Sequence, residues 1–359
     1  MKRNLVCREI NFTSVTGSMI RSFYIIKNLE QLTGMKTKIF DVFGHIYSVQ
    51  GIINRITYYF YAFLPSTFYF PFPNQTAVKM VKTVSQFSIG PHSFLVNYTE
   101  DPVAQREELG MPIPRDFVRQ QRLVDKFFFG NDRTILIFTT EDFQKEYGSP
   151  DNSVVIHSGA DPDLFKFTPL PSNLKVLFIG GITKNRGLEV LIEGVRIARK
   201  IEKRIQLVIY GYGPDTEYVD YIAKSVSKFG GQYMGKIAHN EVPAIIEDSF
   251  VCVSPAIKST KYNDLGEPMK LFEYMAGGRP VIGSNIKQQE RIIKSEKCGI
   301  IYNDKSPMEL AEALLTVIQD PQKAQIYAKN GREAIEKRWS WKKNVQRAIP
   351  KLRCLGAIP

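Results

Sequence analysis

Residues 266–284, GEPMKLFEYMAGGRPVIGS, place one carboxylate and one amine in an otherwise apolar helical pattern. Proline suits the first helical position because its missing N–H would have no partner there, and the two glycines suit a left-handed end. The pattern therefore predicts a helix that begins at about Pro268. The first turn of a helix leaves free N–H groups and a positive dipole end that favour phosphate, and helical side chains lean toward that end. We expect Glu273 to point toward whatever the helix start binds, with Lys270 nearby.

Alternating strand and helix patterns surround this segment and must position it. Buried strand patterns followed by helices occur in both halves of the chain, and the two series join near Gly159. We therefore expect an α/β fold of GT-B type, meaning two Rossmann-like domains with parallel sheets that face one cleft. The predicted strands are 4–10, 36–43, 93–102, 134–140, 174–181, 205–214, 233–235 and 249–256, and the clearest predicted helices are 20–32, 188–200 and 215–229.

The chain length supports a division into two domains. At 359 residues the chain exceeds one typical domain of about 150 residues. We assign residues 1–159 to an N-terminal domain, 160–337 to a C-terminal domain, and 338–359 to a final helix that crosses back to the first domain. A composition of 43% hydrophobic and 23% charged residues is typical of a globular protein and argues against disordered or collagenous classes.

The charge and the scattered cysteines limit the partners and the compartment. The formal net charge of +12 indicates an anionic partner: a nucleotide, a nucleic acid or a lipid headgroup. Without paired metal-ligand spacing or a signal peptide, the cysteines favour the reducing cytoplasm, and the histidines are interpreted as structural or surface residues. We expect no metal site. The residues concerned are Cys7, Cys252, Cys298, Cys354, His45, His92, His157 and His239.

An aromatic segment without acids lies in the first half. Residues 55–73, RITYYFYAFLPSTFYFPFP, belong to a stretch with no Asp or Glu between Asp41 and Glu100. Proline, serine and asparagine interrupt it too often for a membrane-spanning helix. Two interpretations remain: a buried helix followed by a core strand, or a surface that rests on an anionic membrane within residues 50–82. In the second, the flanking cations are Arg55, Lys79 and Lys82.

The second half resembles the donor-binding domain of retaining glycosyltransferases of the GT-B architecture, family four, also called group 1. The resemblance covers residues 154–341, where the motifs follow the family's order and spacing, whereas the first half is similar only in its order of strands and helices. It implies a nucleotide-sugar as substrate and no cofactor, and the lack of paired metal-binding carboxylates in the sequence fits metal-independent transfer. The motifs are VVIHSGADPDLF, FIGGITKNRGLEVLIEG, IYGYGP, YMGKIAHNEVPAIIEDSFVCVSPA, GEPMKLFEYMAGGRPVIGS, CGIIYND and RWSW.

The resemblance implies that Glu273 binds the ribose hydroxyls and that the helix start receives the diphosphate. A carboxylate can accept hydrogen bonds from both hydroxyls of a vicinal diol. The alternative is that Glu273 pairs with Lys270 on an exposed helix face. For Lys270 itself, two roles are considered: it binds phosphate, or it is a solvated or ion-paired cation. The family often carries a second glutamate, eight positions before the one that Glu273 matches. Leu265 occupies that position in this chain, and the sequence leaves open whether Asp264 or Glu267 takes over its role.

Two glycine loops complete the expected phosphate site. In GGITKNRG, the resemblance implies that Arg186 binds phosphate, which a guanidinium can hold as a fork; the alternative is a solvated loop cation. The family commonly has an arginine early in this loop, and Gly181 occupies that position here. Lys184 is therefore the candidate replacement. In YGYGP, Gly211 and Gly213 either let the backbone approach the ligand or are ordinary turn glycines.

The remaining candidates concern the base and the acceptor. Lys236 and Ile237 match the positions that cradle the base, with core packing as the alternative for Ile237. Gly17 either approaches the diphosphate or is a turn glycine. Glu100 and Asp101 follow a predicted strand and either orient or deprotonate an acceptor hydroxyl or merely cap the next segment. The full expected donor site is Gly17, Lys184, Arg186, Gly211, Gly213, Lys236, Ile237, Pro268, Met269, Lys270 and Glu273, and the expected catalytic set is Arg186, Glu100 and Asp101.

We therefore expect a retaining glycosyltransferase that moves a sugar from a nucleotide diphosphate to a glycan or lipid-linked acceptor. It would act in the cytoplasm or at the inner face of the membrane, with no specific nucleic-acid partner. A GT-B epimerase or phosphorylase is one alternative, and a non-enzymatic protein that binds nucleic acid or membrane is another. A Rossmann oxidoreductase would need a GxGxxG fingerprint near the chain start, where residues 13–19 offer one glycine.

Overall fold

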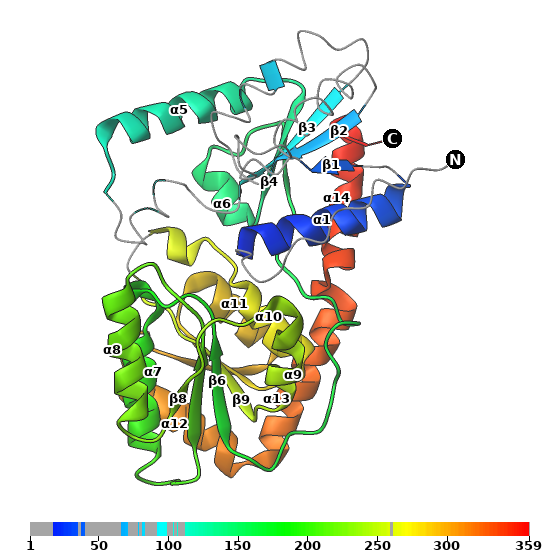
Figure 1. Cartoon of the computed structure of the whole chain (residues 1–359). Helices are drawn as coiled ribbons and strands as arrows, with labels where there is room; N and C mark the ends of the chain where they lie inside the picture. The colour runs from blue at the N-terminus through cyan, green and yellow to red at the C-terminus, as the bar shows by residue number, and fades with distance from the viewer. Residues whose placement is uncertain are drawn as a thin grey trace. The chain divides into compact units, whose positions relative to one another are not determined.

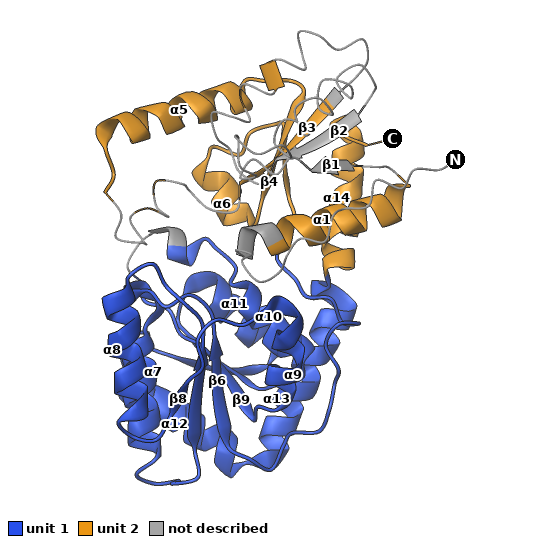
Figure 2. Cartoon of the chain, viewed as in Figure 1, with its two compact units in different colours: residues 1–17, 158–340 blue, residues 18–157, 341–359 orange. Residues whose placement is uncertain are grey.

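The computed structural model divides the chain into two compact units (Figures 1 and 2). Unit 1 comprises residues 1–17 and 158–340, and unit 2 comprises residues 18–157 and 341–359. Each unit contains one parallel sheet of its own. The structure describes residues 17–34, 37–39, 66–70, 78, 81–82, 92–98, 103, 106, 112–258 and 261–358.

The sheet of unit 1 has six parallel strands in the order β11-β10-β9-β6-β7-β8. The strands are β6 (Lys175–Ile179), β7 (Gln206–Tyr210), β8 (Gln232–Tyr233), β9 (Val251–Ser254), β10 (Val281–Ser284) and β11 (Gly299–Tyr302). The helices are α7 (Leu188–Ala198), α8 (Thr216–Ser227), α9 (Val242–Glu247), α10 (Met269–Ala276), α11 (Lys287–Glu296), α12 (Pro307–Gln319) and α13 (Pro321–Ala334). Short turns are η2 (Lys184–Arg186), η3 (His239–Glu241), η4 (Lys261–Asp264) and η5 (Ile335–Trp339).

Helices cover both faces of this sheet, which explains the continuous apolar runs of its strands. Successive strand residues point to opposite faces. In β6, Val176 and Phe178 pack in one core cluster with residues of α7, α8 and α12, whereas Leu177 packs in the other with residues of α10, α11 and η5. The core of unit 1 is therefore two apolar layers on either side of the sheet.

The direction of the chain across this sheet reverses beside β6. From β6 the strand order runs through β7 to β8 on one side, and β9, β10 and β11 follow on the other. In parallel sheets of this kind, ligands bind outside the carboxyl ends of the strands at the point of reversal. The loops after β6 and β9 are therefore the place to look for a site.

The sheet of unit 2 has five parallel strands in the order β1-β2-β3-β4-β5. The strands are β1 (Thr37–Ile39), β2 (Ser66–Phe70), β3 (His92–Tyr98), β4 (Thr134–Phe138) and β5 (Ser153–Val155). Its long helices are α1 (Gly17–Thr33), α5 (Arg115–Phe129) and α14 (Trp341–Cys354), with the short α6 (Glu141–Glu146) after β4. Aromatic rings fill much of its core; Tyr98, for example, lies 5.5 Å from Phe138 and 5.7 Å from Tyr147 between centroids.

The C-terminal helix α14 packs within unit 2. The Trp341 ring is buried and stacks on Tyr24 of α1 at 5.6 Å between centroids, and the Arg21 guanidinium lies 5.8 Å from its centre. Further along, the Asn344 amide donates to the carbonyl of His157 at 3.2 Å. Segments from the two ends of the chain therefore complete one core.

The predicted strands and helices that fall on described residues are confirmed within a few residues of their ends. The strand expected at 4–10 lies outside the described residues. Of the aromatic segment 55–73, the structure describes 66–70, which form β2 between β1 and β3 and so match the strand of the core interpretation. No helix among the described residues is both long and apolar enough to cross a membrane.

Candidate functional site

The loops that leave β6, β7 and β8 are hydrogen-bonded to one another at the carboxyl edge of the unit 1 sheet. The Gly180 N–H donates to the Tyr210 carbonyl at 3.0 Å, and the Gly211 N–H donates to the Gly235 carbonyl at 2.8 Å. Helix α10 follows β9 at this same edge. The hydroxyl oxygen of its Tyr274 accepts a hydrogen bond at 2.9 Å from the N–H of Ile179, the last residue of β6. These bonds bring the expected donor-binding segments of unit 1 together.

Helix α10 begins one residue later than the proline rule predicts. Pro268 precedes the first helical residue and has an extended conformation (φ −69°, ψ 118°), so it is the cap residue rather than the first residue of the helix. No side chain caps this end. Gly278, with φ 64°, provides the left-handed stop. The free N–H groups of the first turn therefore begin at Met269 and Lys270, and an anion bound there would accept hydrogen bonds from them.

Glu273 lies on α10 with only 9% of its surface exposed. Its Oε1 is 2.9 Å from Nε2 of His239, which comes from η3 after β8. The exposed pairing of Glu273 with Lys270 that was considered from the sequence is therefore wrong. Within the described part of the chain, His239 is the hydrogen-bond partner of this carboxylate, through Oε1.

The contact of His239 with Glu273 is the feature of the candidate site that the sequence interpretation missed. A lone histidine in a polar turn carries no spacing signal, and the carboxylate it meets is 34 positions away. The contact depends on two loops that only the sheet brings together. The His239 side chain is only 11% exposed, which agrees with the structural rather than the surface interpretation of this histidine.

Lys270 reaches the glycine turn at the end of β6. Its Nζ lies 4.1 Å from the centre of the Phe178 ring, a cation–π contact. A Cβ added at Gly180 would come within 2.4 Å of this Nζ, so the glycine makes room for the amine. The structure therefore places the positive charge of Lys270 beside the loop that carries Lys184 and Arg186.

Lys184 and Arg186 form the ends of η2 in that loop, and Gly187 follows with φ 64°. Lys184 is exposed and lies 3.9 Å from Asp215, the capping residue of α8. Arg186 is half-buried. The two cations thus stand at the carboxyl end of β6, on the same loop as Gly180.

Gly211 and Gly213 are explained by the packing of one loop on another. A Cβ at Gly211 would lie 1.8 Å from the Gly180 carbonyl oxygen, and one at Gly213 would lie 2.0 Å from that of Ile182. The backbone of the loop after β7 therefore touches the backbone of the loop after β6. An approach of this backbone to a ligand stays a prediction.

Lys236 and Ile237 follow β8 and differ in their surroundings. Lys236 is exposed, with its Nζ 5.0 Å from the centre of the Tyr212 ring. Ile237 is half-buried and packs against the core cluster that contains α10, in agreement with the packing alternative. Its contact with a base stays a prediction.

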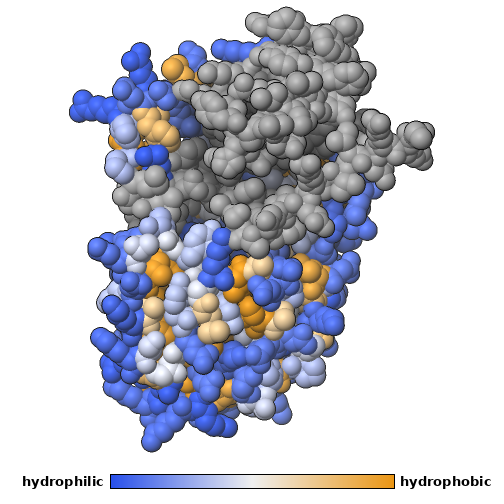
Figure 3. Space-filling model, viewed as in Figure 1, coloured by the Kyte–Doolittle hydropathy of each residue, from blue (hydrophilic) through white to orange (hydrophobic). Residues whose placement is uncertain are grey.

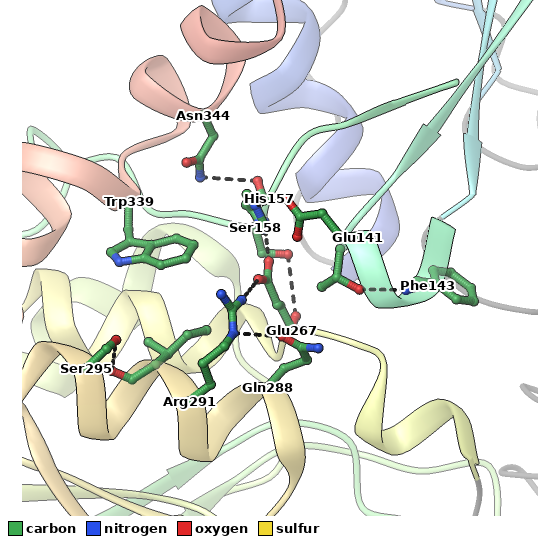
Figure 4. A network of polar contacts seen from close by, with 12 residues as sticks. Glu141, Phe143, His157, Ser158, Glu267, Gln288, Arg291, Ser295, Trp339 and Asn344 are labelled. Atoms are coloured by element: carbon green, nitrogen blue, oxygen red, sulfur yellow. Dashed lines mark hydrogen bonds and ion pairs between the residues drawn. The ribbon is translucent and has the colours of Figure 1, made fainter. Parts of the chain in front are cut away.

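The two carboxylates next to Leu265 both have structural partners. Glu267 has a fully buried side chain whose Oε2 accepts from the Ser158 N–H at 2.9 Å, and Arg291 lies 3.4 Å from its Oε1 (Figure 4). Asp264 accepts from the Lys287 N–H at 2.9 Å. Each carboxylate therefore joins chain segments, and neither is shown to take the place of the missing glutamate.

Three expected residues remain. Gly17 is the first residue of α1, whereas Glu100 and Asp101 fall outside the described residues. Among the residues that the structure describes, no group of three His, Cys, Asp or Glu side chains could hold a metal ion.

Residues 162–334 match the family described as Glycosyl transferases group 1. An uncharacterised glycosyltransferase of Methanocaldococcus jannaschii is 24% identical over 176 residues, 49% of this chain and 44% of that protein. The GDP-mannose-dependent α-(1-6)-phosphatidylinositol monomannoside mannosyltransferase of Mycobacterium tuberculosis is 23% identical over 249 residues, 64% of this chain and 62% of that protein. The chain spans less than two thirds of the length of either relative.

The crystal structure of HepE from Anabaena in complex with UDP-glucose superposes with a TM-score of 0.71. The match covers 95% of this chain and 97% of that one at 15% identity. The fold is therefore the GT-B fold of glycosyltransferases, with two Rossmann-like units that each contain a parallel sheet. Within it, residues 162–334 form a glycosyl transferases group 1 domain.

Proposed function

We propose that the protein is a retaining glycosyltransferase that transfers a sugar from a nucleotide diphosphate to an acceptor hydroxyl or phosphate. The observation that carries this proposal is Glu273 of a group 1 domain, buried on the helix that faces the point where the strand order reverses. A desolvated carboxylate with a free oxygen suits a ribose diol, because both hydroxyls can donate to it.

In the proposed reaction, the cations and the start of α10 stabilise the leaving diphosphate. Arg186, Lys270 and the first N–H groups of α10 supply positive charge where negative charge develops in the transition state. The acceptor attacks on the face from which the leaving group departs, so the leaving phosphate itself helps to take the proton. Such a mechanism needs no protein nucleophile.

Experiment must identify the nucleotide base of the sugar donor. HepE binds UDP-glucose, and the mycobacterial relative is named for GDP-mannose, so uridine and guanosine donors are the first to test. In this proposal Lys236 and Ile237 hold the base through main chain and an apolar side chain, and Lys184, Gly211, Gly213 and Met269 lie around the phosphates.

The proposed acceptor is a glycan or a lipid-linked sugar, bound by unit 2 with Glu100 or Asp101 at its hydroxyl. The name of the mycobacterial relative gives it a lipid-linked acceptor, which supports this class. Membrane contact through the aromatic segment near residues 50–82 also stays a proposal, because most of that segment lies outside the described residues.

A thermal-shift screen with UDP-, GDP- and ADP-sugars tests the donor site. A ligand at 100 times its dissociation constant adds about 2.7 kcal/mol to the free energy of unfolding, which is easily measured. Product analysis with the stabilising donor then separates transfer from epimerisation and phosphorolysis, and the anomeric configuration tests retention. No shift with any nucleotide-sugar, together with DNA binding of steep salt dependence, would favour the non-enzymatic alternative.

A further inference from the structure

Tyr212 is an exposed aromatic residue on a backbone that its neighbours hold in place. Its carbonyl accepts from the Ile182 N–H at 2.9 Å, and the carbonyl of the preceding Gly211 accepts from the Tyr233 hydroxyl at 2.8 Å. Gly213 follows, and a Cβ there would lie 2.0 Å from the Ile182 carbonyl oxygen. The loop after β7 is therefore fixed against the loop after β6, yet Tyr212 itself is 48% exposed.

The Lys236 side chain lies over this ring. Its Nζ is 5.0 Å from the ring centre, so a cation–π contact joins the loops after β7 and β8. In the space-filling view, hydrophobic residues lie among hydrophilic ones on the visible face of unit 1, so an exposed ring is not unusual by itself (Figure 3). The fixed backbone and the neighbouring ammonium distinguish Tyr212, because they offer a ligand a flat apolar surface beside a hydrogen-bond donor.

This pair lies near the residues that we propose for the ribose, and the inference rests on that proposed function. Oε1 of Glu273 is 2.9 Å from Nε2 of His239, and Lys236 precedes His239 by three residues in the connection after β8. Three residues span at most about 10 Å. Since a nucleotide base is bonded directly to its ribose, a ribose at Glu273 brings the base within reach of Lys236 and Tyr212.

We propose that Tyr212 and Lys236 select nucleotide-sugars whose base carries a carbonyl group, uracil or guanine, over those with cytosine or adenine. The base stacks on the Tyr212 ring, since every base has a π face. The Lys236 ammonium can only donate hydrogen bonds. Uracil O4 and guanine O6 accept such a bond, whereas cytosine and adenine carry an amino group at the same positions. An amino group there would face the ammonium as a second hydrogen-bond donor without an acceptor.

Titration calorimetry of the full chain with two pairs of nucleoside diphosphates tests the selection. UDP and CDP differ at position 4 of the base, and IDP and ADP differ at position 6, where IDP carries the same O6 as guanine. In the pair that binds more tightly, the carbonyl-bearing member should have a Kd about tenfold lower. Ribose 5-phosphate, which has no base, measures the part of the affinity that the base does not contribute.

Two variants separate the ring from the cation. Tyr212→Leu should weaken every nucleoside diphosphate about tenfold and leave ribose 5-phosphate unchanged, because stacking on the ring needs a base. Lys236→Met should bring the Kd ratio of the preferred pair close to one, because it removes the hydrogen-bond donor and keeps an unbranched side chain. The matched controls Tyr221→Leu and Lys203→Met change exposed residues elsewhere in unit 1 and should alter neither affinity nor ratio. Unchanged melting temperatures show that the variants are folded.

Three outcomes would overturn this inference while the proposed function stands. The amino-bearing member binds as tightly as its partner, or Lys236→Met keeps the wild-type ratio, or Tyr212→Leu affects ribose 5-phosphate as much as the nucleotides. If the wild type binds none of the four nucleoside diphosphates, the nucleotide site itself is refuted, and the proposed function fails together with this inference.

Discussion

The contact of 2.9 Å between His239 and Glu273 shows how one carboxylate can serve two purposes. The histidine contacts one oxygen of the carboxylate, so in the proposed function the carboxylate is oriented before the ribose arrives. Such orientation lowers the entropy lost on binding. Two residue-scale predictions follow from this arrangement.

Replacing Glu273 with Gln should weaken donor binding about tenfold or more with little change in melting temperature. The substitution keeps the shape but removes a charged acceptor, and hydrogen bonds to charged groups contribute about 1.5–3 kcal/mol. Titration calorimetry with the nucleoside diphosphate measures the effect. Glu267→Gln is the control, because its buried carboxylate joins Ser158 and Arg291, and it should lower the melting temperature more than the affinity. The reverse pattern would refute the ribose assignment.

His239→Gln should raise the donor KM several-fold while kcat changes less, because the histidine acts through Glu273. In the double variant with Glu273→Gln, the two effects should not add, since residues in contact share one interaction. The comparison of single and double variants isolates that coupling. Additive losses would show that the histidine does not position the carboxylate.

At the scale of elements, the loops after β6 and β7 are packed backbone against backbone, and Gly211→Ala tests that packing. The new Cβ would lie 1.8 Å from the Gly180 carbonyl oxygen at a residue with φ 152°. We expect a loss of about 2 kcal/mol or more in the free energy of unfolding, comparable with other strained backbone sites. Thermal unfolding measures it. Gly181→Ala, where a Cβ meets nothing within 4 Å, should be nearly neutral; equal losses would contradict the account.

The sequence predicts these elements well where hydrophobic period and turn residues agree. The run TILIF gives β4 and KVLFI gives β6, because both faces of a parallel strand are buried. The sequence cannot show that Gly211 faces a carbonyl of another loop, because that contact depends on how the two loops pack. His239 illustrates the same limit for the site.

Arg279 is a second residue whose place the sequence does not predict. An arginine before a strand suggests a surface cation, yet Arg279 is fully buried, and burial lowers the pKa of its guanidinium. It donates to carbonyls of Ile246, Glu247 and Thr168 at 3.1, 2.6 and 3.1 Å. These carbonyls lie at the end of α9 and in a distant loop, and only the folded chain brings them together.

At the scale of the whole molecule, each unit has its own core, and Trp341 belongs to that of unit 2. Trp341→Ala should destabilise that unit by about 3–5 kcal/mol, the usual cost of truncating a buried aromatic residue. Limited proteolysis with mass mapping should then find the first cuts in unit 2. In Trp339→Ala the first proteolytic cuts should instead fall in unit 1. If the first cuts fall in the same unit for both variants, the division of the chain into two units with separate cores is contradicted.

Trp339 and Trp341 are the only tryptophans of the chain, and one residue, Ser340, separates them at the boundary between the units. Trp339 donates its indole N–H to Glu296 at 2.8 Å, whereas Trp341 lies under an arginine and stacked on a tyrosine. The chain therefore contains two built-in optical reporters, one for each half. A pair of single Trp→Phe variants would record the unfolding of either unit by its own fluorescence, with no dye attached.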